Sequence, residues 1–347
     1  MRAVAVPEPG RLELVEVPEP RPGPYEALTE ILTCSICSGT DSHILNGTFR
    51  HRDYPGILGH ESVGRVIECG PKVRYLHPGD LVLRPCAVRP GDPPLGGYHS
   101  LFGGFAEYGI VADAQAIIED TPRNQQPPLP YFAAAQQVLP PDFDPDLAGA
   151  FITYKETFSF LQQLGVQPGK SLLILGSGTV GMNLALAGKF LGAYPVIVTA
   201  RRQEVLMRAL DVGADIGIDV SRHDMNLAVQ FITDERGADF IVEAVGSWQV
   251  LQDGMRALAS GGQIGIYGIA PESTATIDWS GMPSDWSLRF IHPREEWVHN
   301  QVLEQMDMGW LDLRQFISHT LTMDEIHQGF ELVRSRQATK VVIRIRE

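Results

Sequence analysis

Apolar and polar residues alternate along the first third of the chain, which is the pattern of half-buried β-strands. The alternation is clearest at residues 12–17, and further short strand patterns at residues 63–68 and 79–83 stand next to Gly and Pro residues. We therefore predict a β-rich region over residues 1–120.

Two proline-rich stretches interrupt this pattern. Residues 85–97 hold four prolines and three glycines, and residues 122–145 hold seven prolines. Because proline fixes φ and lacks a backbone donor, the second stretch is expected to contain neither a helix nor a central strand. It is the best candidate for a boundary between domains.

After about residue 147 the pattern changes to apolar strands that alternate with helices. We expect helices at residues 151–164, 180–191 and 203–212, and strands at residues 171–175, 196–198, 216–218, 240–243 and 263–267. Such alternation predicts an α/β fold with a parallel sheet covered on both faces. The tail from about residue 294 mixes helices with a last strand at residues 340–345.

The composition is that of a globular chain long enough for two domains. The 347 residues are 44% hydrophobic and 20% charged, with a net charge of −14. This negative charge argues against nucleic acid or an anionic membrane as a partner, because both are bound by clustered Lys and Arg. Any anionic ligand must therefore be held by a local basic group.

Nothing in the sequence predicts a membrane or secreted protein. No apolar run approaches the ~20 residues of a membrane span, and the first residues lack the apolar core of a signal peptide. Four cysteines in so long a chain do not indicate a disulfide framework. We expect a protein of the reducing cytoplasm.

A glycine-rich turn between an expected strand and an expected helix indicates a dinucleotide site. Residues 176–181 fit G-x-G-x-x-G, with Gly176, Gly178 and Gly181 as its glycines and Thr179 and Val180 at the helix start. The glycines permit a tight turn and close approach to a pyrophosphate, which faces the helix N-terminus. The alternative is a glycine-rich turn in some other α/β fold.

The end of the next expected strand indicates which nucleotide is preferred. An NAD site places an acidic residue ~20 residues beyond the glycines. This chain has Ala200 there, followed by Arg201 and Arg202. Two guanidinium groups can bind a 2′-phosphate, so NADP(H) is favoured over NAD(H). The alternative is that the arginines only solvate the helix start.

A run of polar residues near the N-terminus carries possible metal ligands. Cys37, His60 and Glu61 offer sulfur, nitrogen and oxygen, the three donor types that zinc accepts. Two alternatives are ordinary polar residues in loops and a redox pair formed by Cys34 and Cys37. No thioredoxin-like context follows the cysteines, and we interpret Cys34 as a packing residue.

These motifs together resemble the zinc-dependent medium-chain dehydrogenase/reductase family. Residues 34–43 resemble the C-G-I-C-G-T-D-x-H run of its alcohol and polyol dehydrogenases, and residues 59–64 resemble G-H-E-x-x-G. Residues 79–82, 103–108 and 243–246 are also similar. The resemblance covers nearly the whole chain in the expected order, but it does not specify a substrate.

The resemblance implies a Rossmann domain inserted into a GroES-like catalytic domain. The expected limits are residues 1–150 for the first part of the catalytic domain, 151–293 for the Rossmann domain and 294–347 for the return. The family transfers a hydride between a nicotinamide cofactor and an alcohol or carbonyl compound, here an alcohol, polyol, sugar or cyclitol. A homodimer or homotetramer is also implied.

The resemblance also implies roles for individual residues. Cys37 and His60 match zinc ligands, and Glu61 matches a glutamate that ligates directly or through water. Thr40 matches the hydroxyl beside the substrate oxygen, and His43 the outer end of a proton relay. Asp41 matches a carboxylate that orients a ligand histidine. Residues expected to complete the cofactor site are Val245, Gly246 and Gly268.

Three departures from the family pattern affect these expectations. The segment from Cys37 to His43 is one residue longer than usual. Only Cys86 remains of a four-cysteine lobe that binds a structural zinc in relatives, so we expect a single, catalytic zinc. Phe151 and Ile152 occupy the positions of the last family ligand, and Glu156, one helical turn further, is a possible substitute.

Two other functions remain open from the sequence. The missing family ligand is compatible with a zinc-free quinone or enone reductase of the same fold. A non-catalytic nucleotide-binding protein is the third hypothesis.

Overall fold

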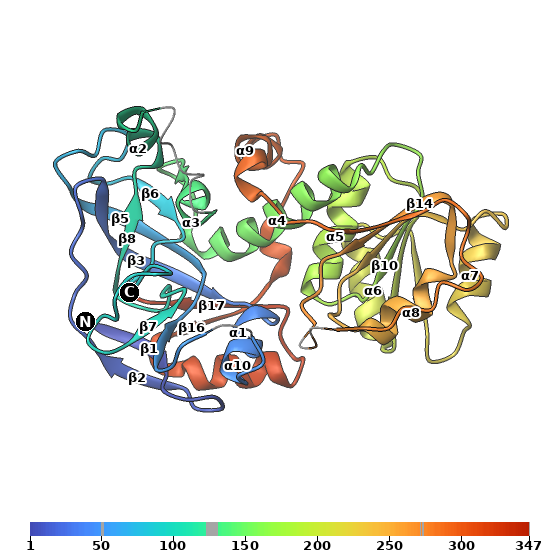
Figure 1. Cartoon of the computed structure of the whole chain (residues 1–347), viewed down its shortest axis with the longest axis horizontal. Coiled ribbons are helices and arrows are strands. Elements are labelled where there is room, and N and C mark those ends of the chain that lie inside the picture. The colour runs from blue at the N-terminus through green and yellow to red at the C-terminus, as the bar shows by residue number, and fades with distance from the viewer. Residues whose placement is uncertain (50–51, 123–130, 271, 273, 347) are drawn as a thin grey trace. The chain divides into compact units, whose positions relative to one another are not determined.

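The computed structural model describes residues 1–49, 52–122, 131–270, 272 and 274–346. The chain divides into two units, Met1–Ile152 with His299–Glu347 and Thr153–Val298 (Figure 1). The division falls inside helix α4 (Ala148–Leu164), so the proline-rich stretch at residues 122–145 is not where the units separate. No helix among the described residues is long and apolar enough to cross a membrane.

The first unit is built on two sheets. In its described part, a seven-stranded sheet has the order β16-β17-β3-β5-β6-β9 with β8 also paired to β3, and a four-stranded sheet has the order β2-β1-β4-β7. The strands of the larger sheet are β3 (Glu26–Ile36), β5 (Glu61–Cys69), β6 (Leu81–Leu83), β8 (Tyr108–Ala112), β9 (Val138–Leu139), β16 (Ile317–Thr322) and β17 (Lys340–Arg344). Those of the smaller sheet are β1 (Arg2–Val6), β2 (Glu13–Glu16), β4 (Gly56–Leu58) and β7 (His99–Leu101). The predicted β-rich region is therefore confirmed.

Strand β3 was not expected from the sequence, although it is the longest strand of this sheet. Its polar residues are buried, which hides the alternation that reveals a half-buried strand. The Thr29 hydroxyl donates to the Gly109 carbonyl at 2.9 Å, and the Thr33 hydroxyl donates to the Pro145 carbonyl at 2.8 Å. Internal hydrogen bonds thus let a partly polar strand lie in the middle of the sheet.

Short helices complete the first unit. They are α1 (Thr40–Leu45), α2 (Ala114–Asp120), α3 (Tyr131–Ala135), α9 (His299–Asp307) and α10 (Ile326–Arg334). The prediction of no helix over residues 122–145 was wrong for α3. Residues 131–139 contain no proline, so they are free to form α3 and the short strand β9. Residues 123–130 lie outside the described residues.

The second unit is a parallel sheet with helices on both faces. Its described strands have the order β12-β11-β10-β13-β14-β15, and all neighbouring pairs are parallel. They are β10 (Leu172–Leu175), β11 (Val196–Ala200), β12 (Ile216–Asp219), β13 (Ala238–Glu243), β14 (Leu258–Ile266) and β15 (Ser287–Phe290). The connecting helices are α5 (Thr179–Phe190), α6 (Gln203–Val212), α7 (Met225–Ile232) and α8 (Trp248–Met255). The predicted doubly covered sheet is confirmed, with the strand order of a dinucleotide-binding fold.

Opposite faces of the strands bury against different helices. Helix α5 packs on the face that includes Leu172 and Val196, since a Cβ at Gly188 would lie 2.5 Å from the Leu172 side chain. Leu173 and Ile197 form the other face with residues of α7 and α8 (Figure 1). The near-continuous apolar strands follow from this burial on both sides.

The turn between β10 and α5 depends on one close backbone contact. A Cβ at Gly181 would lie 2.0 Å from the Gly176 carbonyl oxygen, whereas a Cβ at Gly178 would meet nothing within 4 Å. Gly176 has φ +107°, in the region that favours glycine. The three glycines of the turn therefore have different physical roles.

We expect Gly181→Ala to destabilise the protein, because the new methyl group forces α5 away from the turn. Overpacking of this kind costs about 1–3 kcal/mol, and each kcal/mol lowers Tm by roughly 2–4 °C for a unit of this size. Gly178→Ala is the matched control and should cost less than about 1 kcal/mol. Thermal unfolding followed by circular dichroism measures both, and equal Tm values for the two variants would contradict the argument.

Candidate metal centre and nucleotide turn

The neighbours of β3 bring three distant parts of the first unit together. Ser35 of β3 pairs with Glu61 of β5, and Ile36 pairs with Val341 of β17. Cys37 directly follows β3, while Glu61 and Lys340 are the first residues of β5 and β17. The register of these three strands therefore places a thiol, a carboxylate and an ammonium group at the same end of the sheet.

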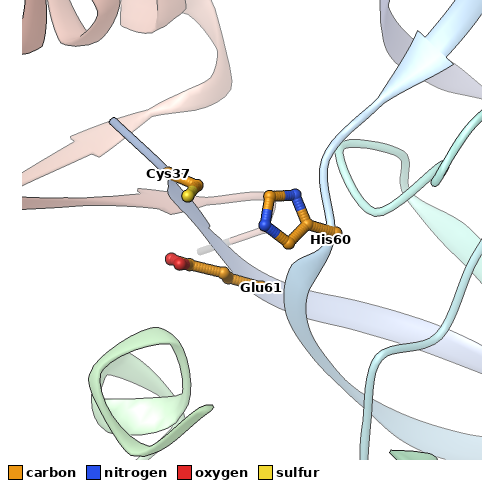
Figure 2. Close-up of side chains that lie close together, drawn as sticks. All are labelled: Cys37, His60 and Glu61. Atoms are coloured by element: carbon orange, nitrogen blue, oxygen red, sulfur yellow. The ribbon is translucent and has the colours of Figure 1, made fainter. Parts of the chain in front are cut away.

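Cys37, His60 and Glu61 form a group that could hold a metal ion. One ligand atom from each lies within 4.8 Å of the other two, and Figure 2 shows their side chains around a common space. A tetrahedral zinc site with bonds of ~2.0–2.3 Å has ligand–ligand edges of roughly 3.5 Å, so small side-chain movements suffice. The sulfur, nitrogen and oxygen donors fit zinc.

Asp41 fixes two of these residues. Its buried carboxylate accepts a hydrogen bond from the Cys37 backbone N–H at 2.8 Å and lies 3.1 Å from Nδ1 of His60. An ionised carboxylate can only accept, so Nδ1 of His60 donates to Asp41, and Nε2 is the ring nitrogen left for a metal once it has lost its own proton. This is the geometry in which a carboxylate orients a ligand histidine.

The electrostatic surroundings of His60 act in opposite directions. Burial lowers the pKa of His60, but the charge and hydrogen bond of Asp41 raise it, as does Cys37, and the net pKa lies well above its ordinary value. A bound cation therefore has to displace a proton from this ring.

The residue before His60 must be glycine. Gly59 has φ +103°, and a Cβ there would lie 2.5 Å from the Phe105 ring and 2.7 Å from the Phe105 backbone nitrogen. The first glycine of the G-H-E-x-x-G run thus has a steric cause.

Lys340 is the main site residue that the sequence did not reveal. Its ammonium group donates to both carboxylate oxygens of Glu61, at 2.8 and 2.6 Å, and both side chains are at least 96% buried. The two residues are 279 positions apart. The available signal was a lysine directly before three apolar residues of a strand, because a buried charge requires a partner.

The start of α4 also approaches Glu61. A Cβ at Gly149 would lie 2.2 Å from the Ser35 hydroxyl and 3.2 Å from a Glu61 carboxylate oxygen. The buried Ser35 hydroxyl has no hydrogen-bond partner among the described residues. An unsatisfied hydroxyl beside a candidate ligand is compatible with a water molecule at this position.

Among the residues that the structure describes, no hydrogen bond joins Thr40 and His43, the expected relay residues. Thr40 is the first residue of α1, and Nδ1 of His43 lies 2.8 Å from the exposed Thr48 hydroxyl. Gly39 is the N-cap of α1, so the turn after Cys37 ends directly before Thr40. The relay through Thr40 and His43 stays a prediction.

The position of the missing family ligand is apolar and fully buried. Phe151 packs against the rings of Phe143 and His299 at centroid distances of 5.4 and 5.6 Å. Glu156, the possible substitute, accepts a hydrogen bond from the Tyr267 hydroxyl at 3.2 Å within the second unit. Among the described residues, Glu156 does not belong to the group of potential ligands.

Two other cysteines are deeply buried. Desolvation by burial, with smaller contributions from Asp41 and Glu61, raises the pKa of Cys34 well above its ordinary value. Burial raises the pKa of Cys86 to about 12. Cys34 is therefore a packing residue and not half of a reactive pair with Cys37.

In the second unit, the glycine-rich turn leaves the start of α5 open. Gly178 is the N-cap of α5, and no side chain caps the helix. The Thr199 hydroxyl accepts a hydrogen bond from the Gly176 N–H at 3.1 Å, which ties the turn to β11. The missing side-chain cap and the open space at Gly178 suit a pyrophosphate at the start of α5.

Arg201 and Arg202 lie at the end of β11, directly before α6. Both side chains are exposed, and neither guanidinium makes a hydrogen bond or ion pair with another described residue. Ala200, where an acidic residue is expected for NAD, ends the strand. Two unpaired cations are thus available at the place where a 2′-phosphate is expected.

A second tight turn follows β13. The buried Glu243 carboxylate accepts hydrogen bonds from the N–H groups of Val245, Gly246 and Ser247, while burial raises its pKa. A Cβ at Gly268 would lie 2.1 Å from the Gly246 backbone nitrogen. This close contact places Gly268 beside Val245 and Gly246. A cofactor site built from these three residues requires them to lie together.

Comparison with known proteins agrees with the fold and with the predicted family. Residues 23–121 match the family model described as "Alcohol dehydrogenase GroES-like domain", and residues 179–288 match the model described as "Zinc-binding dehydrogenase". The chain is 33% identical to L-threonine 3-dehydrogenase of Pyrococcus horikoshii, over 100% of this chain and 99% of the relative. The enzyme of the same name from Thermococcus kodakarensis is 32% identical, with 95% and 93% covered.

A solved structure is similar over the whole chain. Alcohol dehydrogenase TADH from Thermus sp. ATN1 superposes with a TM-score of 0.82 at 27% identity, covering 100% of both chains. The chain belongs to the zinc-dependent medium-chain dehydrogenase family. It is an NAD(P)-dependent oxidoreductase that acts on CH–OH groups of small molecules, which confirms the predicted family, fold class and enzyme class.

We expect Lys340→Met to destabilise the metal-free protein strongly, because it leaves the Glu61 carboxylate buried without its counterion. Breaking a buried pair from one side costs roughly 3–5 kcal/mol. The double variant Lys340→Met/Glu61→Gln removes both charges and should recover most of this loss. Denaturant unfolding in the presence of EDTA measures the three proteins, and a double variant no more stable than Lys340→Met would contradict the assignment.

Proposed function

We propose that this chain is a zinc-dependent, NADP(H)-preferring alcohol dehydrogenase with a single catalytic metal held by Cys37, His60 and Glu61. The observation that carries the proposal is the convergence of three different donor atoms within 4.8 Å. When bound, zinc supplies a Lewis acid for the oxygen of an alcohol or carbonyl substrate. The nucleotide supplies or accepts the hydride.

The chain's own residues prepare this chemistry. Asp41 holds the Cys37 backbone and selects the His60 tautomer that leaves Nε2 available. Lys340 compensates the negative charge of the buried Glu61 carboxylate. In this proposal Glu61 binds the metal either directly or through a water molecule. In the proposed relay, Thr40 accepts the substrate proton, and His43 carries it to solvent.

The names of the relatives indicate the substrate class. L-Threonine 3-dehydrogenases act on a small amino acid with a secondary hydroxyl group. We propose a small polar secondary alcohol as the substrate of this chain. Sugars and cyclitols carry the same group and remain members of the class.

We also propose the domain limits, the assembly and the cellular compartment of the protein. Residues 1–150 and 294–347 form the catalytic domain and residues 151–293 the nucleotide-binding domain. The assembly is a homodimer or homotetramer in the cytoplasm. All four cysteines are free, which supports a reducing compartment.

Loss of the thiol ligand should remove zinc and activity together. We expect Cys37→Ala to lose stoichiometric zinc and to lower kcat by roughly 100-fold or more, since even outer partners of a metal site contribute 10–100-fold. Cys34→Ala is the matched control in the same C-x-x-C segment and should keep its zinc. Elemental analysis and NADPH-dependent carbonyl reduction are the measurements, and full activity in zinc-free Cys37→Ala would indicate a zinc-free reductase.

The arginine pair should determine the nucleotide preference. Because charge-assisted hydrogen bonds contribute ~1.5–3 kcal/mol, Arg201→Ala/Arg202→Ala should lower kcat/KM for NADPH by roughly 10–100-fold. The kcat/KM for NADH should change by less than about threefold, because NADH has no 2′-phosphate for the arginines to bind. Arg256→Ala removes a paired surface arginine of the same unit and should change neither. Equal losses with both nucleotides would refute the role.

A further inference from the structure

A cation stacked on two aromatic rings lies next to His60 in the first unit. The ring of Phe102, just after β7, has its centroid 5.2 Å from that of His60, and the Phe49 ring stands at its edge at 6.4 Å. The guanidinium carbon of Arg52 lies 4.4 Å from the Phe102 centroid and 5.0 Å from the Phe49 centroid. We call Arg52, Phe49 and Phe102 the Arg52 shelf.

The charge of Arg52 has no anionic partner among the described residues. Its half-buried side chain lies over the two rings, and its buried Nε has no hydrogen-bond partner among the residues that the structure describes. Other arginines of the same unit, such as Arg74 and Arg344, are paired with carboxylates. The hydroxyl of the neighbouring Tyr54 donates to the Ile44 carbonyl and does not bind Arg52.

Burial makes this lone cation costly. Desolvation lowers the pKa of Arg52, although Tyr54 raises it. A partly desolvated guanidinium gains more from an anion than an exposed one does, because the local dielectric constant is lower. Its planar fork binds carboxylate and phosphate groups through two parallel hydrogen bonds.

The shelf is also held in place. Phe102 has φ +76°, a conformation that a bulky residue adopts only where surrounding contacts enforce it. Its backbone N–H donates to the Ser100 hydroxyl at 3.3 Å. The strained residue therefore holds a ring that contacts both Arg52 and His60, which keeps the cation near the proposed metal centre.

We propose that Arg52 binds an anionic group of the substrate, so that the enzyme acts on alcohols that also carry a carboxylate or phosphate. This inference rests on the proposed function, because it uses the metal centre at His60 as the place where the hydroxyl group binds. The net charge of −14 repels anions in general, and a local cation is therefore needed to hold one. Stacking on Phe49 and Phe102 orients the guanidinium for this contact.

Matched substrate pairs test the proposal. The pairs are 3-hydroxybutyrate with its methyl ester, and glycerol 3-phosphate with glycerol, each assayed with NADP⁺ on wild type, Arg52→Ala and Arg52→Lys. We expect Arg52→Ala to lower kcat/KM for the preferred anionic compound by roughly 10–100-fold, mainly through KM, and to change the neutral partner by less than about threefold. Arg52→Lys should be intermediate, since lysine keeps the charge but not the fork.

Arg65→Gln is the control, because Arg65 is an arginine of the same unit whose guanidinium bonds the Gly79 carbonyl. It should leave both members of each pair unchanged. If the loss in Arg52→Ala falls on 3-hydroxybutyrate, the site binds a carboxylate. If it falls on glycerol 3-phosphate, the site binds a phosphate. Equal losses on charged and neutral substrates in Arg52→Ala would show a structural role and overturn the proposal.

A measurement without turnover separates this inference from the proposed function. Propionate and inorganic phosphate, tested as probes at equal ionic strength, should raise the Tm of the zinc-loaded wild type more than that of Arg52→Ala. Equal shifts in both proteins would overturn the anion site even if the enzyme is active. Loss of zinc or of all dehydrogenase activity in wild type would instead refute the proposed function.

Discussion

The register of β3 against β5 and β17 is the constraint on which the metal centre depends. Side chains of a strand alternate between faces, so a shift of one residue would reverse the face of every partner. With Ser35 opposite Glu61 and Ile36 opposite Val341, the residues that end or begin these strands meet at one place. Buried polar residues of β3 donate hydrogen bonds to the carbonyls of Gly109 in β8 and of Pro145, which ties β3 to the rest of the unit.

Charge compensation then determines how the site can be occupied. Asp41 and Glu61 are both buried carboxylates, and each faces a cationic or proton-bearing partner, His60 and Lys340 respectively. A metal ion entering this group would add positive charge near Lys340, which weakens the attraction between Lys340 and Glu61. The carboxylate is therefore shared between two cations, and its position depends on which of them attracts it more strongly.

Local chemistry was predictable from the sequence, whereas long-range pairing was not. The glycine-rich turn and the alternating units of the second half depend on short segments, and their elements lie within a few residues of the expected limits. Cys37, His60 and Glu61 were recognised as candidate ligands because they lie in one short part of the chain. Lys340 was not, since its partner is 279 residues away and only the sheet brings the two together. Strand β3 was missed for a similar reason, because Thr29 and Thr33 find their partners at Gly109 and Pro145, far along the chain.

The late position of β17 affects how the protein is made. Glu61 emerges from the ribosome long before Lys340, and at 5–20 residues per second the interval is roughly 15–55 s. During this time the nascent chain holds a carboxylate, a thiol and an imidazole without the ammonium group that later neutralises the carboxylate. The early domain therefore carries more negative charge around these donors than the finished protein does, and it would attract divalent cations before its sheet is complete.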